Sequence, residues 1–234
     1  MINGKKVLAF IPARGGSKRL PRKNVLPLAG KPLICWSIDA AKHSKYIDSI
    51  FVSTDDSEIA DVVSEYGIDI PELRPKWLAS DTATTESVLI YTLEKFAKDA
   101  DIVIILQPTS PLRTAEHIDR AVELFIKKQA QSVVSVTPCE HSPLWTNTLP
   151  KNGSVHNFIR PEALKRSQEL EKFYRFNGAI YIFDTKILIE QQKICYTSLS
   201  YAYLMENSVS FDIDHKLDFE LAEFILNKYG HNQT

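Results

Sequence analysis

Continuous apolar runs alternate along the chain with segments whose apolar residues recur every three or four positions. The runs are typical of strands that are buried on both faces of a parallel sheet. They predict strands over residues 7–11, 49–54, 101–106, 132–137 and 179–183. The segments between the runs have helical spacing and predict helices over residues 33–41, 56–66, 89–96, 118–125 and 215–229. This strict alternation predicts an α/β fold with a doubly wound, mostly parallel sheet.

The alternation stops at Pro138 and resumes near residue 179. Residues 138–176 contain four prolines and scattered aromatic residues without a regular period. We therefore expect a single domain over residues 1–234 with an insertion at about 138–176. An irregular segment cannot easily bury large apolar side chains within one α/β layer, so its composition predicts the interface of a homodimer. The apolar residues in question are Leu144, Trp145, Leu149, Phe158, Ile159, Leu164, Phe173 and Tyr174.

Charge is distributed unevenly along a chain whose net charge is only −1. The first 38 residues hold eight Lys or Arg and no Asp or Glu, so the rest carries 20 basic and 29 acidic side chains, a net of −9. The acidic remainder disfavours nucleic acid as a partner and favours a small anion held by one loop. No apolar run approaches the ~18 residues of a membrane span, so we expect no membrane partner. The three cysteines form no C-x-x-C pair, which favours reduced thiols and a cytoplasmic location.

The early basic residues gather in the loop after the first predicted strand, residues 13–24 (ARGGSKRLPRKN). Ligands of open α/β sheets bind beyond the carboxyl ends of the strands, where this loop begins. Gly15 and Gly16 permit a close backbone approach, and their amides can cradle oxyanions. Five cationic side chains within ten residues repel one another unless an anion binds, so the loop predicts a polyphosphate site. It matches neither G-x-x-x-x-G-K-[ST] nor G-x-G-x-x-G, which disfavours a P-loop NTPase and a dinucleotide-binding fold.

Residues 11–24 (IPARGGSKRLPRKN) also resemble the N-terminal signature of the cytidylyltransferases that activate sialic acids and related nine-carbon sugars. Four further segments are similar to motifs of that family, in the same order along the chain. They are Arg74-Pro75 with LASDT at 78–82, QPTSPLR at 107–113, RFNGAIY at 175–181 and FDID at 211–214. The set covers nearly the whole chain and indicates a member of the CMP-sialic acid synthetase (acylneuraminate cytidylyltransferase) family. The resemblance implies a Rossmann-like nucleotidyltransferase fold.

The reaction implied by the resemblance joins CTP to the anomeric hydroxyl of a nine-carbon 2-keto sugar acid and releases pyrophosphate. Such a transfer needs aligned phosphates and neutralised charge. The resemblance assigns nucleotide binding to Ala13, Arg14, Gly15, Gly16, Ser17, Lys18, Lys23, Asn24, Arg74 and Thr85. We expect Lys23 to lie nearest the reacting phosphate and to form the catalytic group with Arg14, Asp212 and Asp214. A turn role for Asn24 and a helix N-cap role for Thr85 are the alternatives.

Asp212 and Asp214 stand two residues apart, a spacing that puts both side chains on one face of a strand. Two carboxylates on one face repel each other unless a cation lies between them. Hard oxygen ligands suit Mg²⁺, which would also take phosphate oxygens and water. The two residues are therefore the predicted metal ligands, and Mg²⁺ is the predicted cofactor. The alternative is that Asp214 caps the last helix.

The resemblance assigns the sugar to Gln107, Arg175, Asn177 and Tyr181. Which sugar it is stays open among N-acetylneuraminic, legionaminic and pseudaminic acids. Trp145 stands where some sialic acid enzymes have a lysine, and Cys195-Tyr196 stands near a position where some have two phenylalanines. The main interpretation is an enzyme acting on N-acetylneuraminic acid or a close relative, with legionaminic or pseudaminic acid as alternatives. Another sugar nucleotidyltransferase and a non-catalytic nucleotide-binding module are further alternatives.

The resemblance also implies a homodimer in which the insertion reaches the partner's sugar pocket. His141, Trp145 or Arg160 would then act in the other subunit.

Overall fold

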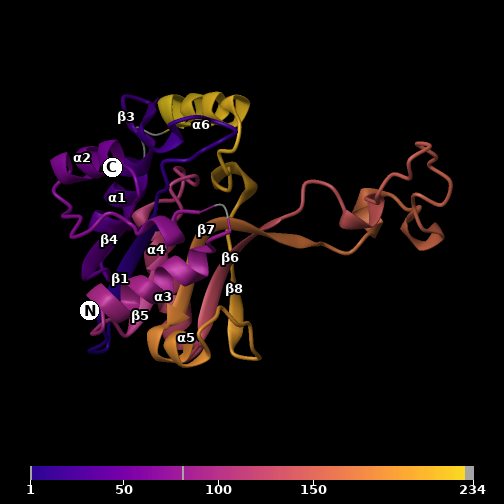
Figure 1. Ribbon diagram of the computed structural model, residues 1–234. Coiled ribbons are helices and arrows are strands. Elements are labelled where there is room, and N and C mark those ends of the chain that lie inside the picture. The colour runs from indigo at the N-terminus through magenta and orange to yellow at the C-terminus, as the bar shows by residue number, and fades with distance from the viewer. Residues whose placement is uncertain (1, 81, 230–234) are drawn as a thin grey trace.

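The computed structural model describes residues 2–80 and 82–229. In this part of the chain six strands form one sheet in the order β4-β1-β5-β7-β6-β8. Their bounds are β1 Val7–Pro12, β4 Ser49–Ser53, β5 Ile102–Ile105, β6 Ser132–Pro138, β7 Tyr174–Asp184 and β8 Ser200–Leu204. β7 runs antiparallel to both of its neighbours, and all other neighbouring strands are parallel. The predicted mostly parallel sheet is therefore confirmed (Figure 1).

Helices cover both faces of the sheet because alternate strand residues point to opposite sides. Val7, Ala9 and Ile11 of β1 join the apolar cluster formed with α1, α2 and α4. Leu8 and Phe10 of the same strand join the cluster formed with α3 and α5. The helices are α1 Leu33–His43, α2 Ser57–Glu65, α3 Thr85–Phe96, α4 Ala115–Lys127, α5 Thr185–Gln191 and α6 Lys216–Tyr229. Among these described helices, none has the length and apolarity needed to cross a membrane.

The apolar pattern did not predict the edge strand β8, the helix α5 or the short antiparallel pair β2 Pro27–Leu28 and β3 Lys31–Pro32. β8 lies at the sheet edge, where its side chains are half-exposed or exposed, so it forms no continuous apolar run. α5 has seven residues, too few to show a helical period in the sequence. β8 and α5 both follow β7 in the chain; β8 forms the edge of the sheet farthest from β4, and Leu188 of α5 packs in the same cluster as Leu8 and Phe10.

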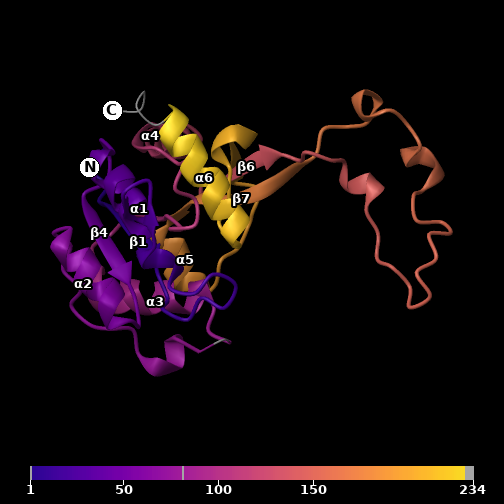
Figure 2. The ribbon, with the colours of Figure 1, turned by 90° about the horizontal axis from the view of Figure 1, so that it is seen from above.

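A long irregular arm, residues 139–173, leaves the sheet between β6 and β7. Figure 1 and Figure 2 show it projecting away from the body of the molecule in two perpendicular views. It contains three short 3₁₀ turns, Pro143–Trp145, Pro161–Ala163 and Ser167–Glu169. The outer residues of the predicted insertion instead belong to the sheet, because Pro138 pairs with Tyr174 and Thr137 with Arg175. The register of β6 against β7 shifts between Val134 and Val136.

Candidate active site

A cavity of about 670 Å³ opens at the carboxyl end of the parallel strands. Its walls come from the loop after β1, the segment before and including the start of α3, the turn after β5, and the segment before α6. The described lining residues are Pro12, Arg14, Ser17, Lys18, Arg19, Lys23, Asn24, Arg74, Ala83, Thr84, Thr85, Val88, Gln107, Pro108, Thr109, Asp212 and Asp214. The fold therefore brings most of the predicted site residues to one place. Four distant segments meet there because the parallel strands that precede them end at the same edge.

The loop after β1 is fixed by hydrogen bonds at both of its ends. The Ala13 amide donates to the Ser53 carbonyl at 2.9 Å. The Gly15 amide donates to the Asp55 carboxylate at 3.0 Å, and the Asn24 side-chain amide donates to the Arg14 carbonyl at 3.0 Å. These bonds hold the predicted phosphate loop against β4, so contacts within the protein fix its backbone.

The two glycines of this loop differ in their surroundings. A Cβ atom on Gly15 would lie 2.5 Å from Oδ2 of Asp56, whereas one on Gly16 would meet nothing within 4 Å. Asp56 is held in place because its carboxylate accepts the Glu58 and Ile59 amides at the start of α2. Gly15 is therefore required for close packing. Gly16 leaves backbone exposed next to the cavity, and neither glycine is among the lining residues.

Lys23 reaches across the cavity to the segment that precedes α6. It begins a short 3₁₀ turn, Lys23–Val25, directly after Arg22, whose φ of 58° turns the chain. Its ammonium donates to the Ile213 carbonyl and lies 3.6 Å from a carboxylate oxygen of Asp214. Burial lowers the pKa of Lys23, and the charges of Asp214 and Asp212 oppose that shift. The side chain is thus a largely buried cation on the cavity wall.

The acidic pair flanks Ile213, which is fully buried. The Ile213 amide donates to the Thr109 carbonyl at 2.9 Å, so this segment is tied to the turn after β5. Asp212 and Asp214 both line the cavity. Burial raises the pKa of Asp212, although a hydrogen bond from Thr109 opposes the shift. Arg19 forms an ion pair with Asp214.

Asp218, not the Asp214 side chain, satisfies backbone amides at the start of α6. Its carboxylate accepts the Asp214 amide at 3.0 Å and the His215 amide at 2.7 Å. Asp218 lies in the first turn of α6, where a carboxylate is favoured by the positive end of the helix. The Asp214 carboxylate is directed instead to Lys23 and Arg19.

The acidic pair does not form a complete metal site by itself. Among the described residues no group of three or more His, Cys, Asp or Glu side chains could hold a metal ion. Two carboxylates facing the cavity fit Mg²⁺, because this ion keeps several waters and is often bound through one or two carboxylates and substrate phosphates. The donor set therefore fits a metal that arrives with the phosphates.

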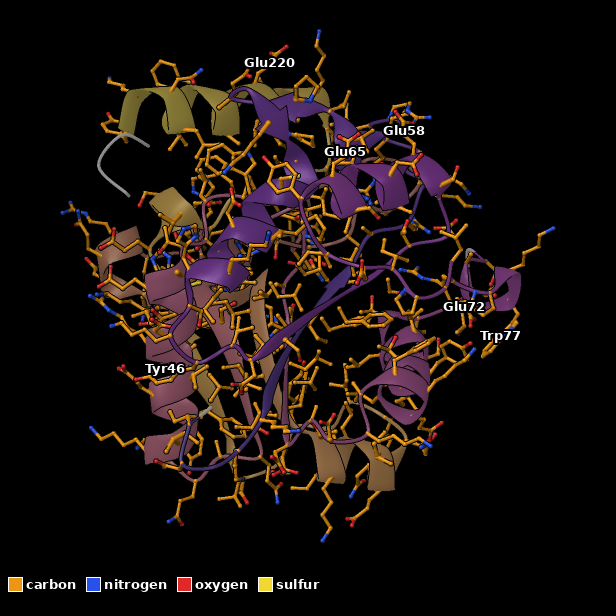
Figure 3. All side chains as sticks on the ribbon, turned by 90° about the vertical axis from the view of Figure 1, so that its left-hand side faces the viewer. Tyr46, Glu58, Glu65, Glu72, Trp77 and Glu220 are labelled. Atoms are coloured by element: carbon orange, nitrogen blue, oxygen red, sulfur yellow. The ribbon has the colours of Figure 1, made fainter. Side chains whose placement is uncertain are left out.

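Arg74 lies on the opposite wall, fixed to the end of β4. Its guanidinium donates to the Ser53 carbonyl at 2.6 Å and to the Ser53 hydroxyl at 3.1 Å. Burial lowers the pKa of Arg74, and the charge of Asp55 opposes the shift. Nearby, the Trp77 ring packs edge-on against Tyr91 of α3, with centroids 5.7 Å apart. Figure 3 shows Glu72 and Trp77 on this segment at the edge of the molecule.

α3 begins at the cavity, and its cap is Thr84. The Thr84 hydroxyl accepts the Ser87 amide at 3.1 Å, so the N-cap role considered for Thr85 belongs to its neighbour. Thr84 and Thr85 both line the cavity. Asp81, within the LASDT motif, lies outside the described residues.

Of the predicted sugar residues, Gln107 lines the cavity, whereas Arg175, Asn177 and Tyr181 are not among its described lining residues. The Gln107 side chain packs over Gly178, whose φ is +78° and where a Cβ would lie 2.9 Å from Oε1 of Gln107. Arg175 is 3.4 Å from Glu140 at the base of the arm. Tyr181 contacts Phe176 edge-on, with centroids 6.3 Å apart. Burial raises the pKa of Tyr181, and the charges of Tyr196 and Asp212 act in the same direction.

Asn177 occupies a structural position within the sheet. It is 2 % exposed, and its amide nitrogen donates to the Ser210 hydroxyl at 2.9 Å. Its amide oxygen accepts from the Ser135 hydroxyl at 2.5 Å and the Ala179 amide at 3.2 Å. These bonds tie β6 and β7 to the segment that leads to the acidic pair. Sequence alone could not separate this role from ligand contact, because both need a polar residue at the cleft end of a strand.

Comparisons with known proteins agree with this geometry. The family model described as Cytidylyltransferase matches residues 8–230. The CMP-N,N'-diacetyllegionaminic acid synthase of Legionella pneumophila is 42% identical over 230 residues, covering 94% of this chain and 96% of that protein. The pseudaminic acid cytidylyltransferase of Campylobacter jejuni is 36% identical, covering 98% of this chain and 99% of that protein. The chain therefore belongs to the cytidylyltransferase family, among the CMP-sialic acid synthetases and their relatives.

The fold is also found in a solved structure of a more distant protein. A CMP:2-keto-3-deoxy-manno-octonic acid synthetase, complexed with CTP, superposes with a TM-score of 0.74 over 96% of this chain and 99% of its own. At 17% identity this likeness concerns the fold alone. It confirms the expected nucleotidyltransferase architecture. The protein is an enzyme of the nucleotidyltransferase class.

Proposed function

We propose that this chain transfers CMP from CTP to the anomeric hydroxyl of a nine-carbon 2-keto sugar acid of the legionaminic type, releasing pyrophosphate. The observation that carries the proposal is the meeting of two opposite charge groups across one cavity. The basic loop after β1 supplies Arg14, Lys18 and Lys23, and the segment before α6 supplies Asp212 and Asp214. The volume of about 670 Å³ is in the range of small-molecule sites.

The nucleotide half of the site follows from the charges. Cations on the loop after β1 neutralise the triphosphate, and the backbone of this loop is already fixed by Asp55 and Asn24. Lys23 is placed to follow charge onto the leaving pyrophosphate, because its ammonium lies between the basic loop and the acidic pair. A fixed cation in a site that excludes water stabilises the charge developing on the pyrophosphate more than solvent does.

Mg²⁺ is part of the proposal, with Asp212 and Asp214 as its protein ligands. When bound, the ion would neutralise phosphate charge and help to align the transfer. Lys23 and Arg19 both pair with Asp214. Binding of phosphates gives these cations a new partner, which leaves Asp214 available to the metal.

The sugar half rests on Gln107 and on the residues beside it. Gln107 offers an amide to the sugar hydroxyls or carboxylate. Phe176, Tyr181 and Tyr196 form an aromatic group next to β7, with Phe176 and Tyr196 centroids 5.6 Å apart. Aromatic faces of this kind suit the apolar methyl groups of an acylated sugar. The name of the 42% identical relative supports a legionaminic acid over other nine-carbon acids.

The test is a pyrophosphate-release assay with four nucleoside triphosphates and a panel of acceptors. The panel holds legionaminic, pseudaminic and N-acetylneuraminic acids, an eight-carbon keto acid and a sugar phosphate. We expect release with CTP and a nine-carbon acid, highest kcat/KM with the legionaminic type, and loss of activity with a chelator. A preference for another nucleotide, or release only with a sugar phosphate, would contradict the reaction. A preference for another nine-carbon acid would correct the sugar alone.

A further inference from the structure

Arg113 is a fully buried guanidinium directly behind the turn that carries Gln107. It belongs to the QPTSPLR motif and is 2 % exposed. In the described part of the chain no carboxylate forms an ion pair with it, and its Nη1 has no hydrogen-bond partner. A buried charge without a charged partner is not repaid by an opposite charge for the water that it loses. Charge pairing therefore gives no reason for an arginine here.

The contacts of Arg113 give a different reason. Its Nη2 donates to the Ser37 hydroxyl at 2.6 Å and to the Gln107 carbonyl at 3.4 Å, and its Nε donates to the Ala179 carbonyl at 3.3 Å. Ser37 donates in turn to the Gln107 carbonyl at 3.3 Å. The planar guanidinium of Arg113 thus joins the turn after β5 to β7.

One of these carbonyls belongs to Gln107 itself, and the other belongs to Ala179, the neighbour of Gly178. Ala179 follows Gly178, over which the Gln107 amide packs. The Arg113 guanidinium therefore fixes both the backbone of Gln107 and the backbone on which its side chain packs. The charge adds to this effect. α4 begins two residues after Arg113, and the amino end of a helix is also positive. Glu116 lies in the first turn of α4 and pairs with Arg120, whereas no described carboxylate pairs with Arg113, so the guanidinium charge favours an anion on the cavity side of Gln107.

We propose that Arg113 is a positioning residue for the sugar half of the site, an inference that rests on the proposed function. It holds the Gln107 and Ala179 carbonyls so that the Gln107 amide faces the cavity. Its charge favours the carboxylate of the sugar acid beside Gln107. Arg113 makes no contact with substrate and acts through Gln107.

The experiment compares Arg113→Met, Arg113→Lys and a control, Arg120→Met. Arg120 lies on the same stretch of chain but is exposed and paired with Glu116, so the control removes one positive charge from the surface of α4. Amide hydrogen exchange is measured first, on the free proteins. We expect faster exchange at residues 106–113 in Arg113→Met and unchanged exchange over Ala115–Lys127.

Steady-state kinetics is the second readout. In Arg113→Met we expect KM for the sugar acid to rise roughly tenfold, the scale of a lost charged hydrogen bond, with KM for CTP within about twofold. Arg113→Lys keeps the positive charge but loses the planar set of guanidinium hydrogen bonds. Its KM for the sugar acid should therefore lie between that of the wild type and that of Arg113→Met. The control should match the wild type.

Wild-type exchange and kinetics in Arg113→Met would overturn the inference, as would an equal rise of both KM values with early melting. If Arg113→Met fails to fold, the Arg113→Lys variant decides by the same two readouts. If the wild type uses no sugar acid, the proposed function fails by itself. The hydrogen-exchange measurement then still decides whether Arg113 holds the turn that carries Gln107.

Discussion

At the scale of single residues, Lys23 has the position of a group that stabilises charge on the phosphates. Replacing it with alanine should lower kcat by roughly 100-fold or more, because a fixed cation in a water-poor site is lost. KM for the sugar should change little, since Lys23 faces the phosphate loop and the acidic pair rather than Gln107. Steady-state kinetics of Lys23→Ala checks this. If kcat of Lys23→Ala lies within a few-fold of the wild-type value, the role of stabilising charge on the phosphates would belong to Lys18.

The acidic pair allows a prediction that separates metal binding from helix capping. Asp212→Asn and Asp214→Asn should each raise the Mg²⁺ concentration needed for half-maximal rate and slow turnover without unfolding the protein. Asp218 already satisfies the amides at the start of α6, so neither substitution removes that cap. Normal Mg²⁺ dependence together with early melting in both variants would support capping instead. Asp218→Asn is the matched variant that should melt early and keep its metal dependence.

Asp212 should also make the free energy of unfolding depend on pH, in a direction that follows from its raised pKa. Burial raises its folded pKa, so between the ordinary pKa and the raised one the folded state binds more protons than the unfolded state. This group therefore makes the free energy of unfolding fall as pH rises through that window. Melting curves from pH 3 to pH 7 should show a weaker fall for Asp212→Asn than for the wild type. Identical pH profiles for the two proteins would show that Asp212 is solvated in the folded state.

At the scale of elements, the loop after β1 depends on two glycines with different roles. Gly15→Ala should destabilise the protein by about 1 kcal/mol, because the new Cβ displaces Asp56 from its cap on α2. It should also weaken CTP binding, since Asp55 holds the same loop. Gly16→Ala should leave the melting temperature within the range of surface substitutions. Thermal melting and CTP titration of the two variants check this, and equal melting temperatures would contradict it.

At the scale of the whole molecule, the arm of residues 139–173 predicts association with a second copy. It projects from the body in Figure 1, and Leu149 and Leu164 are 65% and 69% exposed. Exposed apolar side chains on a projecting segment suit a twofold partner better than solvent. The partner's arm would then complete the sugar half of each site, near Arg175 and Glu140.

Sedimentation of the wild type and of an arm-shortened chain tests this association. The Cys139 amide donates to the Phe173 carbonyl at 2.8 Å, so a short turn between these two residues keeps the hairpin closed. We expect a dimer for the wild type and a monomer for the shortened chain, which should still bind CTP but use the sugar poorly. A wild type that is monomeric at micromolar concentration and fully active would refute the composite site.

Local sequence determined the core of the fold and the family. Buried parallel strands must be apolar on both faces, so residues 7–11 and 101–106 could be recognised without a structure. The basic loop after the first strand could be recognised because its charges and glycines are adjacent in sequence. Both signals are local, and both agree with the structure. The strand β8 has no continuous apolar run, because it lies at the edge of the sheet and its side chains are half-exposed or exposed.

Tertiary structure alone decided which polar residues face the cavity and which hold it together. Asn177 and Gln107 are both polar residues at the cleft end of strands, yet one is enclosed by Ser135 and Ser210 and the other packs over Gly178 into the cavity. Arg113 is buried behind them, with no charged partner among the residues that the structure describes. The spacing of residues along a strand sets the face on which a side chain lies. Its neighbours come from strands and loops that are distant in sequence, and only the packed fold brings them into contact.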